Sequence, residues 1–468
     1  MALRGTFSSR AGFIAAAAGS AVGLGNIWKF PFEVERGGGA AFVVMYLVFA
    51  FLLCFPVMVT EIAIGRKTNK NPVAAFGSLG FPKWNLIGKV GTFCGVLILS
   101  YYNIVAGWAL GYLIEMLMGN FDIGNQFSQA QVGAGEYYYA GDILKVVVYS
   151  IIFMWMTSYV VGKGISGGIE KAAKVLMPSL IIMLFCMVGY ALTLPYAMDG
   201  LKYYLIPEFG EINASSIGGA LRQAFFSLSL GMGTLITYGS YLSKKENIVS
   251  ASALITLADV AIAFIAGLMV FPLIAFNNSG DLTNLVSGPG LLFVNLPNAF
   301  GSMGPGIGVA VGSFFFLLIA FAALTSTVSL LEVPVAYVVD ELKVKRKKAV
   351  WLVAGVIYLV GIPSLLGNGA SEFFTYAFKL PASSDFLSLA AQLSDTLLLL
   401  GGFFIVTFTA YVWKRENFNA ELAQGFDGFE NSLVSKFLNI AISYICPFLL
   451  GLLFIVVLLS NFFGINLI

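Results

Sequence analysis

The sequence predicts an all-α integral membrane protein that crosses the bilayer eleven times. Of its 468 residues, 59% are hydrophobic and only 11% are charged, whereas soluble proteins average about 25% charged residues. Lipid can solvate this much apolar surface, but a water-soluble fold of this length could not bury it. Two of the apolar segments are interrupted by glycine-rich stretches, which predicts broken helices of the kind found at the central sites of transporters.

The spans follow from length and hydrophobicity, because a membrane-spanning helix needs about 20 mainly apolar residues. The segments that satisfy this condition are 11–34, 39–65, 88–119, 142–161, 170–193, 214–241, 247–275, 307–339, 348–367, 384–413 and 436–463. The polar stretches between them are too short to form a separate soluble domain. We therefore expect residues 1–468 to form a single transmembrane domain.

Lysine and arginine predict the orientation, since they are enriched in cytoplasmic loops. With a cytoplasmic N-terminus, most of the 26 basic residues fall inside, including Lys83, Lys89 and the run from Lys343 to Lys348. An odd number of spans then places the C-terminus outside. We expect a multi-pass protein of the cell inner (plasma) membrane, surrounded by membrane lipid.

The composition argues against several classes of function. There is no histidine, so the usual base at neutral pH and the commonest metal ligand are both missing. The four cysteines lie in apolar segments and form no CxxC pair. A net charge of +2 without a basic stripe gives no reason to expect nucleic acid. We expect neither an enzyme nor a nucleic-acid partner.

The two interrupted segments are the first and the sixth. They contain the stretches Gly19–Asn26 and Ser227–Thr234, and each glycine costs a helix about 1 kcal/mol relative to alanine. Small residues such as Gly19 and Gly23 could also serve close helix packing. Two breaks five spans apart instead favour inverted repeats, approximately 11–193 and 214–413, followed by the helix 436–463. Freed amides at a break can face an anion and freed carbonyls a cation, which suits an amino acid together with sodium.

Three stretches resemble a known family. Residues 21–31 read AVGLGNIWKFP, residues 227–241 cover the sixth-span break, and Ala322–Ser326 is followed by Asp340 and Glu341. These residues resemble the neurotransmitter:sodium symporter family, and the resemblance covers the chain through the tenth span. It implies a leucine-transporter-like fold, with a 5+5 inverted repeat and broken helices 1 and 6. It also implies a sodium-coupled symporter of zwitterionic amino acids that works by alternating access.

The resemblance implies two sodium sites. The first would use the Ala21 carbonyl, Asn26, Ser227, Asp259 and the substrate carboxylate. The second would use the carbonyls of Gly19, Val22 and Ala322 and the hydroxyls of Thr325 and Ser326. Taken alone, hydroxyl residues within a helix are more often bonded back to the helix carbonyls.

The resemblance also implies the substrate site. The carboxylate would meet the amides of Leu24 and Gly25 and the hydroxyl of Tyr102, although Tyr102 alone could be a packing aromatic. The ammonium group would meet the carbonyls of Ala21, Phe226 and Ser227 and the hydroxyl of Ser229. The side-chain pocket would be lined by Ile98, Phe226, Met232, Ser326 and Leu330.

Two of these positions predict the substrate class. Monoamine carriers of the family place an aspartate where this chain has Gly23, so we expect an α-amino acid. Met232 is flexible and adapts to different shapes, so we expect a hydrophobic side chain, up to the size of an aromatic one.

The implied gates lie on both sides of the site. Arg4 and Asp340, supported by Ser240 and Tyr241, would form the inner salt bridge, although each charge could simply be solvated at a helix end. Phe226 and Tyr102 would form the outer lid. The pattern Gly168-x9-Pro178 resembles the family's unwinding motif in the fifth span.

The outer charged gate departs from the family pattern. Lys29 replaces an arginine and cannot form a bidentate fork with a carboxylate. Counting back from Gly401 puts Ala390 at the position of the usual aspartate partner, with Asp385 and Asp395 each five residues away. We expect the outer charged gate to be either rebuilt or absent.

The resemblance predicts that chloride is not required. Animal members have a neutral asparagine where this chain has Asp259, and they bind chloride beside the first sodium site. Asp259 would supply that negative charge itself, although it could instead be a charge facing the cytoplasm near a helix start. A channel or an amino-acid sensor remains the competing class of function, and the oligomeric state stays open between monomer and homodimer.

Overall fold

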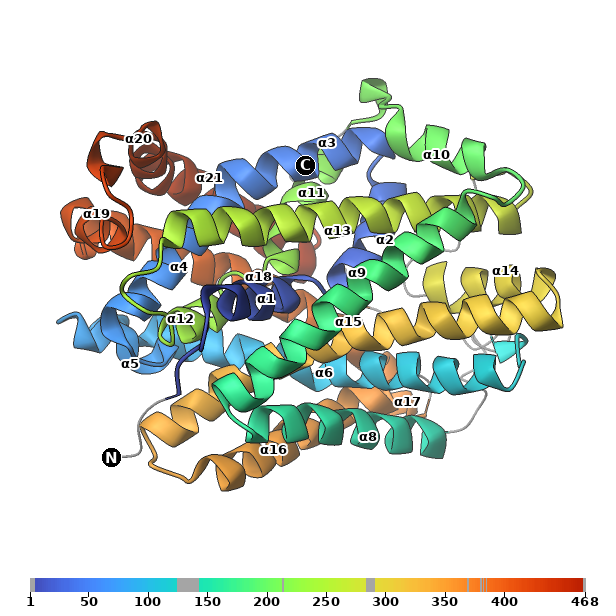
Figure 1. Cartoon of the computed structure of the whole chain (residues 1–468), viewed down its shortest axis with the longest axis horizontal. Coiled ribbons are helices and arrows are strands. Elements are labelled where there is room, and N and C mark those ends of the chain that lie inside the picture. Colours follow the sequence, from blue (N-terminus) through green and yellow to red (C-terminus); the bar gives the residue numbers. More distant parts are fainter. Residues whose placement is uncertain are drawn as a thin grey trace.

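The computed structural model describes residues 5–123, 143–212, 214–282, 291–367, 370–378, 381, 383 and 385–465. This part of the chain is built from helices joined by short loops (Figure 1). The α-helices are α1 Arg10–Ala21, α2 Phe30–Arg36, α3 Ala40–Phe49, α4 Phe55–Thr68, α5 Pro72–Ser78, α6 Asn85–Leu117, α8 Ile143–Gly162, α9 Lys171–Ala191, α10 Ala197–Leu205, α11 Ala214–Ser227, α12 Thr234–Gly239, α13 Ile248–Asn277, α14 Leu296–Ser302, α15 Pro305–Asp340, α16 Arg346–Leu366, α17 Glu372–Tyr376, α18 Phe386–Thr407, α19 Arg415–Leu422, α20 Leu433–Ile440 and α21 Cys446–Phe463.

Short π-helical and 3₁₀-helical turns extend or join these helices. The π-helical turns are η1 Gly25–Lys29, η2 Ala50–Cys54, η4 Ile165–Glu170, η6 Leu291–Asn295, η7 Phe408–Val412 and η9 Ala441–Ile445. The 3₁₀ turns are η3 Pro82–Trp84, η5 Phe209–Glu211 and η8 Phe429–Asn431. Through these turns α3 continues into α4 and α20 continues into α21, so each pair forms one long span.

The helical architecture predicted from the sequence is confirmed. Among the described residues, nine helices are long and apolar enough to cross a membrane, and α1 with the segment Gly25–Arg36 forms a further span bent by 47°. The predicted sixth span is divided between α11 and α12, each of which is too short to cross alone. The boundaries of the two inverted repeats stay a prediction.

Several helices begin where a polar side chain caps the first turn. Ser9 accepts a hydrogen bond from the Gly12 amide at the start of α1. Asn247 does the same at the start of α13, and Asp385 at the start of α18. Such caps satisfy amides that have no partner within the helix, so these residues fix where three of the spans begin.

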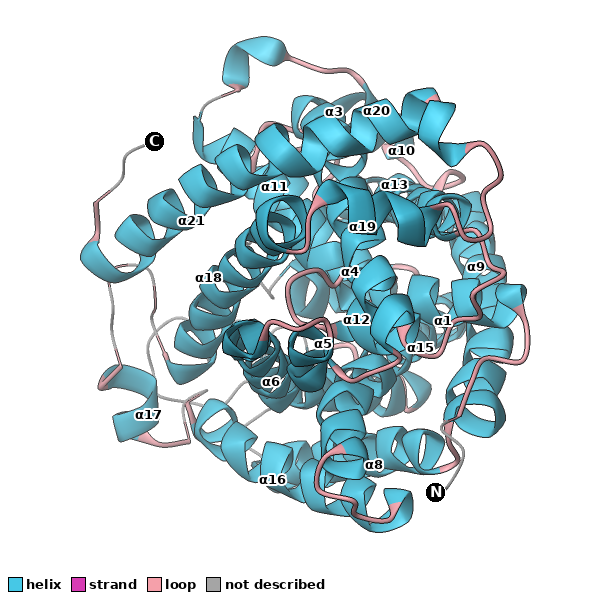
Figure 2. Ribbon diagram, turned by 90° about the vertical axis from the view of Figure 1, so that its left-hand side faces the viewer, coloured by secondary structure: helices cyan, strands magenta, loops and turns pink. Residues whose placement is uncertain are grey.

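The bundle has a buried centre and a periphery that faces outward. The most apolar window of the span that contains α6 is 83% buried, whereas those of α8 and of the last span are only 33% buried. Figure 2, seen from one end of the bundle, shows α6 and α12 in the interior with α8, α16 and α21 around them. The two broken segments lie in this interior, where the candidate site is found.

Candidate functional site

The first break lies between α1 and η1. Helix α1 ends at Ala21, and the chain passes through Val22 and Gly23 before it becomes helical again. The amide of Gly23 donates to Asn26 Oδ1 at 2.9 Å, and the amide of Leu24 donates to the Tyr102 hydroxyl at 3.0 Å. The break thus turns two amides away from the helix, and one of them meets the Tyr102 hydroxyl.

Gly23 is packed too tightly to carry a side chain. A Cβ built at this position would lie 2.1 Å from Ser326 Oγ and 2.8 Å from the Tyr102 hydroxyl. Real Cβ atoms essentially never approach another atom this closely. An aspartate at this position, as monoamine carriers have, would therefore displace the groups that line the break.

The second break lies between α11 and α12. Ser229, Gly231 and Gly233 adopt positive φ angles of 54°, 81° and 78°, which end the helical hydrogen bonding of α11. The amide of Gly231 donates to Glu61 Oε1 at 2.7 Å, and Glu61 is fully buried in α4. Glu61 therefore holds the shape of the break. We did not single out this residue from the sequence, although a carboxylate inside a predicted span is a functional candidate by default.

Asp259 of α13 is the centre of a buried polar cluster beside both breaks. Its Oδ1 accepts hydrogen bonds from Asn26 Nδ2 at 2.7 Å and from Ser227 Oγ at 2.8 Å. Its Oδ2 accepts a bond from the Tyr46 hydroxyl at 2.9 Å. The structure thus brings together Asn26, Ser227 and Asp259, which the sequence assigns to the first sodium site.

Tyr46 was not predicted, because a tyrosine in an apolar span cannot be told from a packing aromatic by sequence alone. All four residues of the Asp259 cluster are at most 2% exposed. A buried carboxylate without a counter-charge is costly even when it is hydrogen-bonded. The donors around it are neutral, so the cluster has the chemistry of a cation site made of hard oxygen atoms.

A second group of oxygens lies where α1 faces α15. The Thr325 hydroxyl lies 3.2 Å from the Val22 carbonyl oxygen and 2.9 Å from the Ala322 carbonyl oxygen. Gly19 is on the same side of α1, since a Cβ there would lie 3.4 Å from Thr325 Cβ. The hydroxyl of Ser326 instead points to the Ser20 carbonyl at 3.4 Å. Four of the five residues expected at the second sodium site therefore meet here, and Ser326 faces the central cavity.

The central cavity lies between the two breaks and has a volume of about 20 Å³. The residues that line it are Ser20, Ala21, Gly23, Gly25, Ile98, Tyr102, Phe226, Ser227, Ser229, Met232, Ser326 and Leu330. Eleven of these were predicted from the sequence, and Ser20 was not. Leu24 does not line the cavity, but its amide meets the Tyr102 hydroxyl that does.

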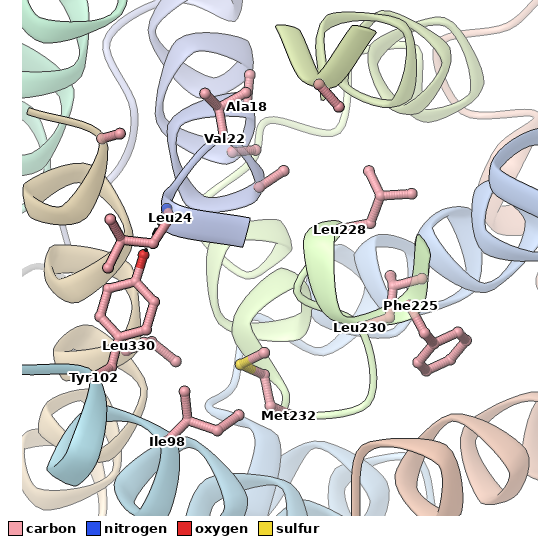
Figure 3. Packing of buried hydrophobic residues seen from close by; sticks show 14 of the residues in the cluster. Ala18, Val22, Leu24, Ile98, Tyr102, Phe225, Leu228, Leu230, Met232 and Leu330 are labelled. Atoms are coloured by element: carbon pink, nitrogen blue, oxygen red, sulfur yellow. Dashed lines mark hydrogen bonds between the residues drawn. The ribbon is translucent and has the colours of Figure 1, made fainter. Parts of the chain in front are cut away.

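The cavity has a polar end and an apolar end. Figure 3 shows Ile98, Met232 and Leu330 gathered on one side, below the bond from Leu24 to Tyr102. Serine hydroxyls cover another part of the wall, where Ser229 Oγ donates to the Ser20 carbonyl at 3.0 Å. This arrangement suits a small molecule with one charged end and one apolar end.

The outer side of the cavity is covered by Phe226 and Lys29. The Lys29 ammonium lies 4.0 Å from the centre of the Phe226 ring and 3.4 Å from Asp395 Oδ2. The charged pair is therefore rebuilt with Asp395, one of the two aspartates that lie five residues from Ala390. Spacing along α18 does not fix how that helix is rotated against α1, so counting from Gly401 could not identify the carboxylate.

Charged residues also make contacts on the side of the site that is predicted to be the inner one. Arg4 lies outside the described residues, and Asp340 accepts a hydrogen bond from Asn71 Nδ2 at 3.5 Å. The Tyr241 hydroxyl donates to Glu332 Oε1 at 2.8 Å, and Arg346 pairs with Glu332 Oε2 at 2.5 Å. These contacts join α15, α16 and the turn that follows α12. Ser240, expected to support the inner salt bridge, instead donates to the carbonyl of Thr237 in its own helix.

The N-terminal segment is tied to the start of the fifth span. The Ser8 amide and hydroxyl both donate to the carboxylate of Glu170, at 2.7 and 2.6 Å. Glu170 ends the π-helical turn that contains Gly168, and Pro178 lies inside α9. The predicted unwinding motif thus lies directly beside the segment that precedes α1.

A smaller cavity of about 10 Å³ lies next to the Thr325 group. Its lining includes Gly19 of α1, Ile169 and Ala173 at the start of the fifth span, and Tyr238 of α12. It therefore lies between the second group of oxygens and the turn that contains Gly168.

Known proteins resemble this chain in both sequence and fold. The family model of the sodium:neurotransmitter symporter family matches residues 4–130 and 138–463. An uncharacterized sodium-dependent transporter of Bacillus subtilis, YhdH, is 36% identical over 422 residues, which cover 90% of each chain. The solved structure of MhsT in complex with L-phenylalanine is 37% identical, with a TM-score of 0.85, and covers 97% of this chain and 99% of that one. A more distant relative, the sodium- and chloride-dependent GABA transporter ine of Drosophila melanogaster, is 24% identical over 77% of this chain and 43% of its own length.

Proposed function

The chain belongs to the sodium:neurotransmitter symporter family, and on that premise we propose that it couples sodium entry to the uptake of zwitterionic α-amino acids with hydrophobic or aromatic side chains. Sodium-coupled transport of an amino acid agrees with the family and with the solved relative that holds L-phenylalanine. The finer choice of substrate rests on the central cavity of this chain. The protein would work by alternating access, with the cavity open to one side of the membrane at a time.

The proposed substrate class rests on the hydrogen bond from the Leu24 amide to the Tyr102 hydroxyl and on the adjacent Gly23, which has no room for a side chain. A substrate carboxylate can replace the bond between this hydroxyl and amide with two bonds to itself. Gly23 has no side-chain carboxylate that could pair with a free amine, so the substrate itself would have to carry the carboxylate. The amino group would lie near the carbonyls of Ala21 and Phe226 and the hydroxyl of Ser229.

The apolar end of the cavity supports the choice of side chain. Ile98, Met232 and Leu330 are each at most 5% exposed and line the cavity together. A charged substrate side chain placed among them would lose its hydration without a partner. A hydrophobic or aromatic side chain gains instead about 25 cal/mol for each Å² of apolar surface removed from water.

We assign two sodium ions as co-substrates. The first would lie on the Ala21 carbonyl, Asn26, Ser227 and Asp259 together with the substrate carboxylate. The second would lie on the carbonyls of Gly19, Val22 and Ala322 and the hydroxyl of Thr325, with Ser326 able to rotate toward it. The carboxylate of Asp259 gives the first site a fixed negative charge, so we propose that transport does not require chloride, unlike the relatives named chloride-dependent.

The two sides of the cavity support alternating access. Lys29, Asp395 and Phe226 cover the outer side, whereas Tyr241 and Glu332 join helices on the inner side. Each set can open while the other stays closed. We place the protein in the plasma membrane with its N-terminus in the cytoplasm and its C-terminus outside, on the basis of the basic residues in the loops, as a monomer or a homodimer.

Uptake into proteoliposomes tests this function directly. The full chain, reconstituted without other proteins, should accumulate tritiated L-phenylalanine when sodium is high outside and should fail to do so with potassium in its place. Leucine, methionine, tyrosine and tryptophan should compete, whereas glycine, aspartate and lysine should not. Preferential uptake of a charged amino acid, or competition by tyramine equal to that by tyrosine, would overturn the proposal.

A further inference from the structure

A separate cavity lies at the periphery of the bundle, between the first turns of α6 and the second half of α18. It has a volume of about 310 Å³. Its lining residues are Lys83, Trp84, Leu86, Ile87, Val90, Leu400, Gly401 and Phe404. We refer to this cavity as the α6–α18 groove.

The walls of the α6–α18 groove are mostly apolar, and two of their large side chains are exposed at the surface of the bundle. Leu86 is 65% exposed and Phe404 is 38% exposed on its walls. Trp84 packs edge-on against Phe404, with ring centres 6.4 Å apart. On the surface of a membrane-spanning bundle, large apolar side chains that lack a protein partner are solvated by hydrocarbon. The natural occupant of such a groove is therefore a lipid acyl chain.

The mouth of the groove carries a positive charge. Lys83 is exposed and lies in the 3₁₀ turn Pro82–Trp84 immediately before α6, and the residues lining the groove, all within the described part of the chain, include no acidic side chain. Tryptophan is enriched where the hydrocarbon core meets the headgroups, so Trp84 marks the depth of the membrane surface. Basic pockets between helices on the cytoplasmic side bind the headgroups of anionic lipids.

We propose that the α6–α18 groove binds one anionic phospholipid of the cytoplasmic leaflet, with an acyl chain along Leu86, Val90 and Phe404 and the headgroup phosphate on Lys83. The charge of Lys83 favours an anionic lipid over a zwitterionic one, and the apolar walls hold the chain. This assignment uses no residue of the substrate cavity or of the sodium sites.

The groove lies against the part of the fold that shapes the second break. A Cβ built on Gly401 would lie 2.2 Å from the Gly231 carbonyl oxygen, and one built on Gly91 would lie 3.1 Å from the same atom. Gly401 lines the groove, and Gly91 follows Val90, which also lines it. A lipid in the groove therefore packs against the two helices that hold the Gly231 carbonyl.

Photo-crosslinking tests the assignment in the intact protein. The full chain is reconstituted in nanodiscs that contain either phosphatidylglycerol or phosphatidylcholine with a diazirine in the acyl chain, and the labelled peptides are mapped by mass spectrometry. Leu400→Trp fills the groove, and Val90→Trp does so from α6. Val356→Trp, at an exposed position of α16, is the matched control.

The expected result is labelling of the peptides that contain Leu86 and Phe404, with loss of that labelling in Leu400→Trp but not in Val356→Trp. Phosphatidylglycerol should label the groove about fivefold more than phosphatidylcholine, equivalent to about 1 kcal/mol for one lysine near the membrane surface. That preference should disappear in Lys83→Ala and remain in Lys347→Ala, which removes another exposed cytoplasmic lysine.

Two outcomes would overturn the proposal. One is groove labelling that does not exceed labelling of the exposed face of α16, or that persists in Leu400→Trp. The other is equal labelling by the two lipids in the wild type. If Leu400→Trp fails to fold, Val90→Trp gives the same comparison, and persistent labelling in that variant would be equally decisive.

Discussion

Replacing Asp259 by asparagine removes the one negative charge from the cluster beside the breaks while keeping its shape. In the structure this carboxylate accepts hydrogen bonds from Asn26 at 2.7 Å, from Ser227 at 2.8 Å and from Tyr46 at 2.9 Å. Two of these donors belong to the proposed first sodium site. Asp259 is itself a proposed ligand of that site, so an ion bound there would lie within about 4 Å of its charge, an interaction worth at least about 4 kcal/mol at an effective dielectric constant near 20.

This magnitude corresponds to about three powers of ten in sodium affinity. We therefore expect Asp259→Asn to raise the sodium concentration needed for half-maximal phenylalanine binding by at least about 100-fold, allowing for partial compensation by water. The wild type should take up phenylalanine equally well with chloride or gluconate. In Asp259→Asn, chloride should partly restore sodium affinity, because it can replace the missing charge.

Tyr46→Phe is the matched control for this experiment. It removes one hydrogen bond to the same carboxylate and leaves the charge in place. Its sodium affinity should fall far less than that of Asp259→Asn, and its transport should stay independent of chloride. The measurement is equilibrium binding of tritiated phenylalanine over a sodium titration in chloride and in gluconate. Wild-type uptake that collapsed without chloride, or an unchanged sodium titration in Asp259→Asn, would refute the reasoning.

Three further predictions concern the cavity and its inner closure. Gly23→Ala should abolish phenylalanine binding, because its Cβ would meet Ser326 Oγ at 2.1 Å, whereas Gly95→Ala, where no atom lies within 4 Å, should bind normally. Tyr102→Phe should weaken binding by about 10- to 100-fold, since a hydrogen bond to a charged group contributes about 1.5–3 kcal/mol. Asp340→Ala should shift the protein toward inward-open states, so that a cysteine placed beside the smaller cavity reacts faster with a water-soluble thiol reagent. A change of 1.4 kcal/mol in that equilibrium alters the ratio of states about tenfold.

Each of these predictions has a clear contrary result. Normal binding by Gly23→Ala would mean that the break can shift to accommodate a side chain. Unchanged phenylalanine binding in Tyr102→Phe would mean that the hydroxyl does not recognise the carboxylate. Unchanged cysteine reactivity in Asp340→Ala would show that its carboxylate does not help to close the inner side.

Some parts of the site could be predicted from the sequence, and others were missed. The cavity wall was largely anticipated, because the glycine-rich breaks and the residues around them form continuous stretches that resemble the family. Ser20 was not predicted, because nothing in the sequence distinguishes a serine that lines a cavity from one that caps a helix or packs between helices. Glu61 and Glu332 could have been found, since both are carboxylates inside predicted spans and such residues are rarely without a function.

The spans, the two breaks and the residue types at the centre of the protein could all be inferred from the amino-acid sequence alone. These depend on local properties: the length of apolar runs, the cost of glycine in a helix, and the polar groups that a break exposes. Contacts between distant segments were decided only by the tertiary structure. Lys29 and Asp395 are 366 residues apart and Tyr46 and Asp259 are 213 apart, and the rotation of one helix against another selects such partners. That rotation is set by packing over the whole bundle, so spacing along a single helix pointed to Ala390, whereas the folded chain pairs Lys29 with Asp395.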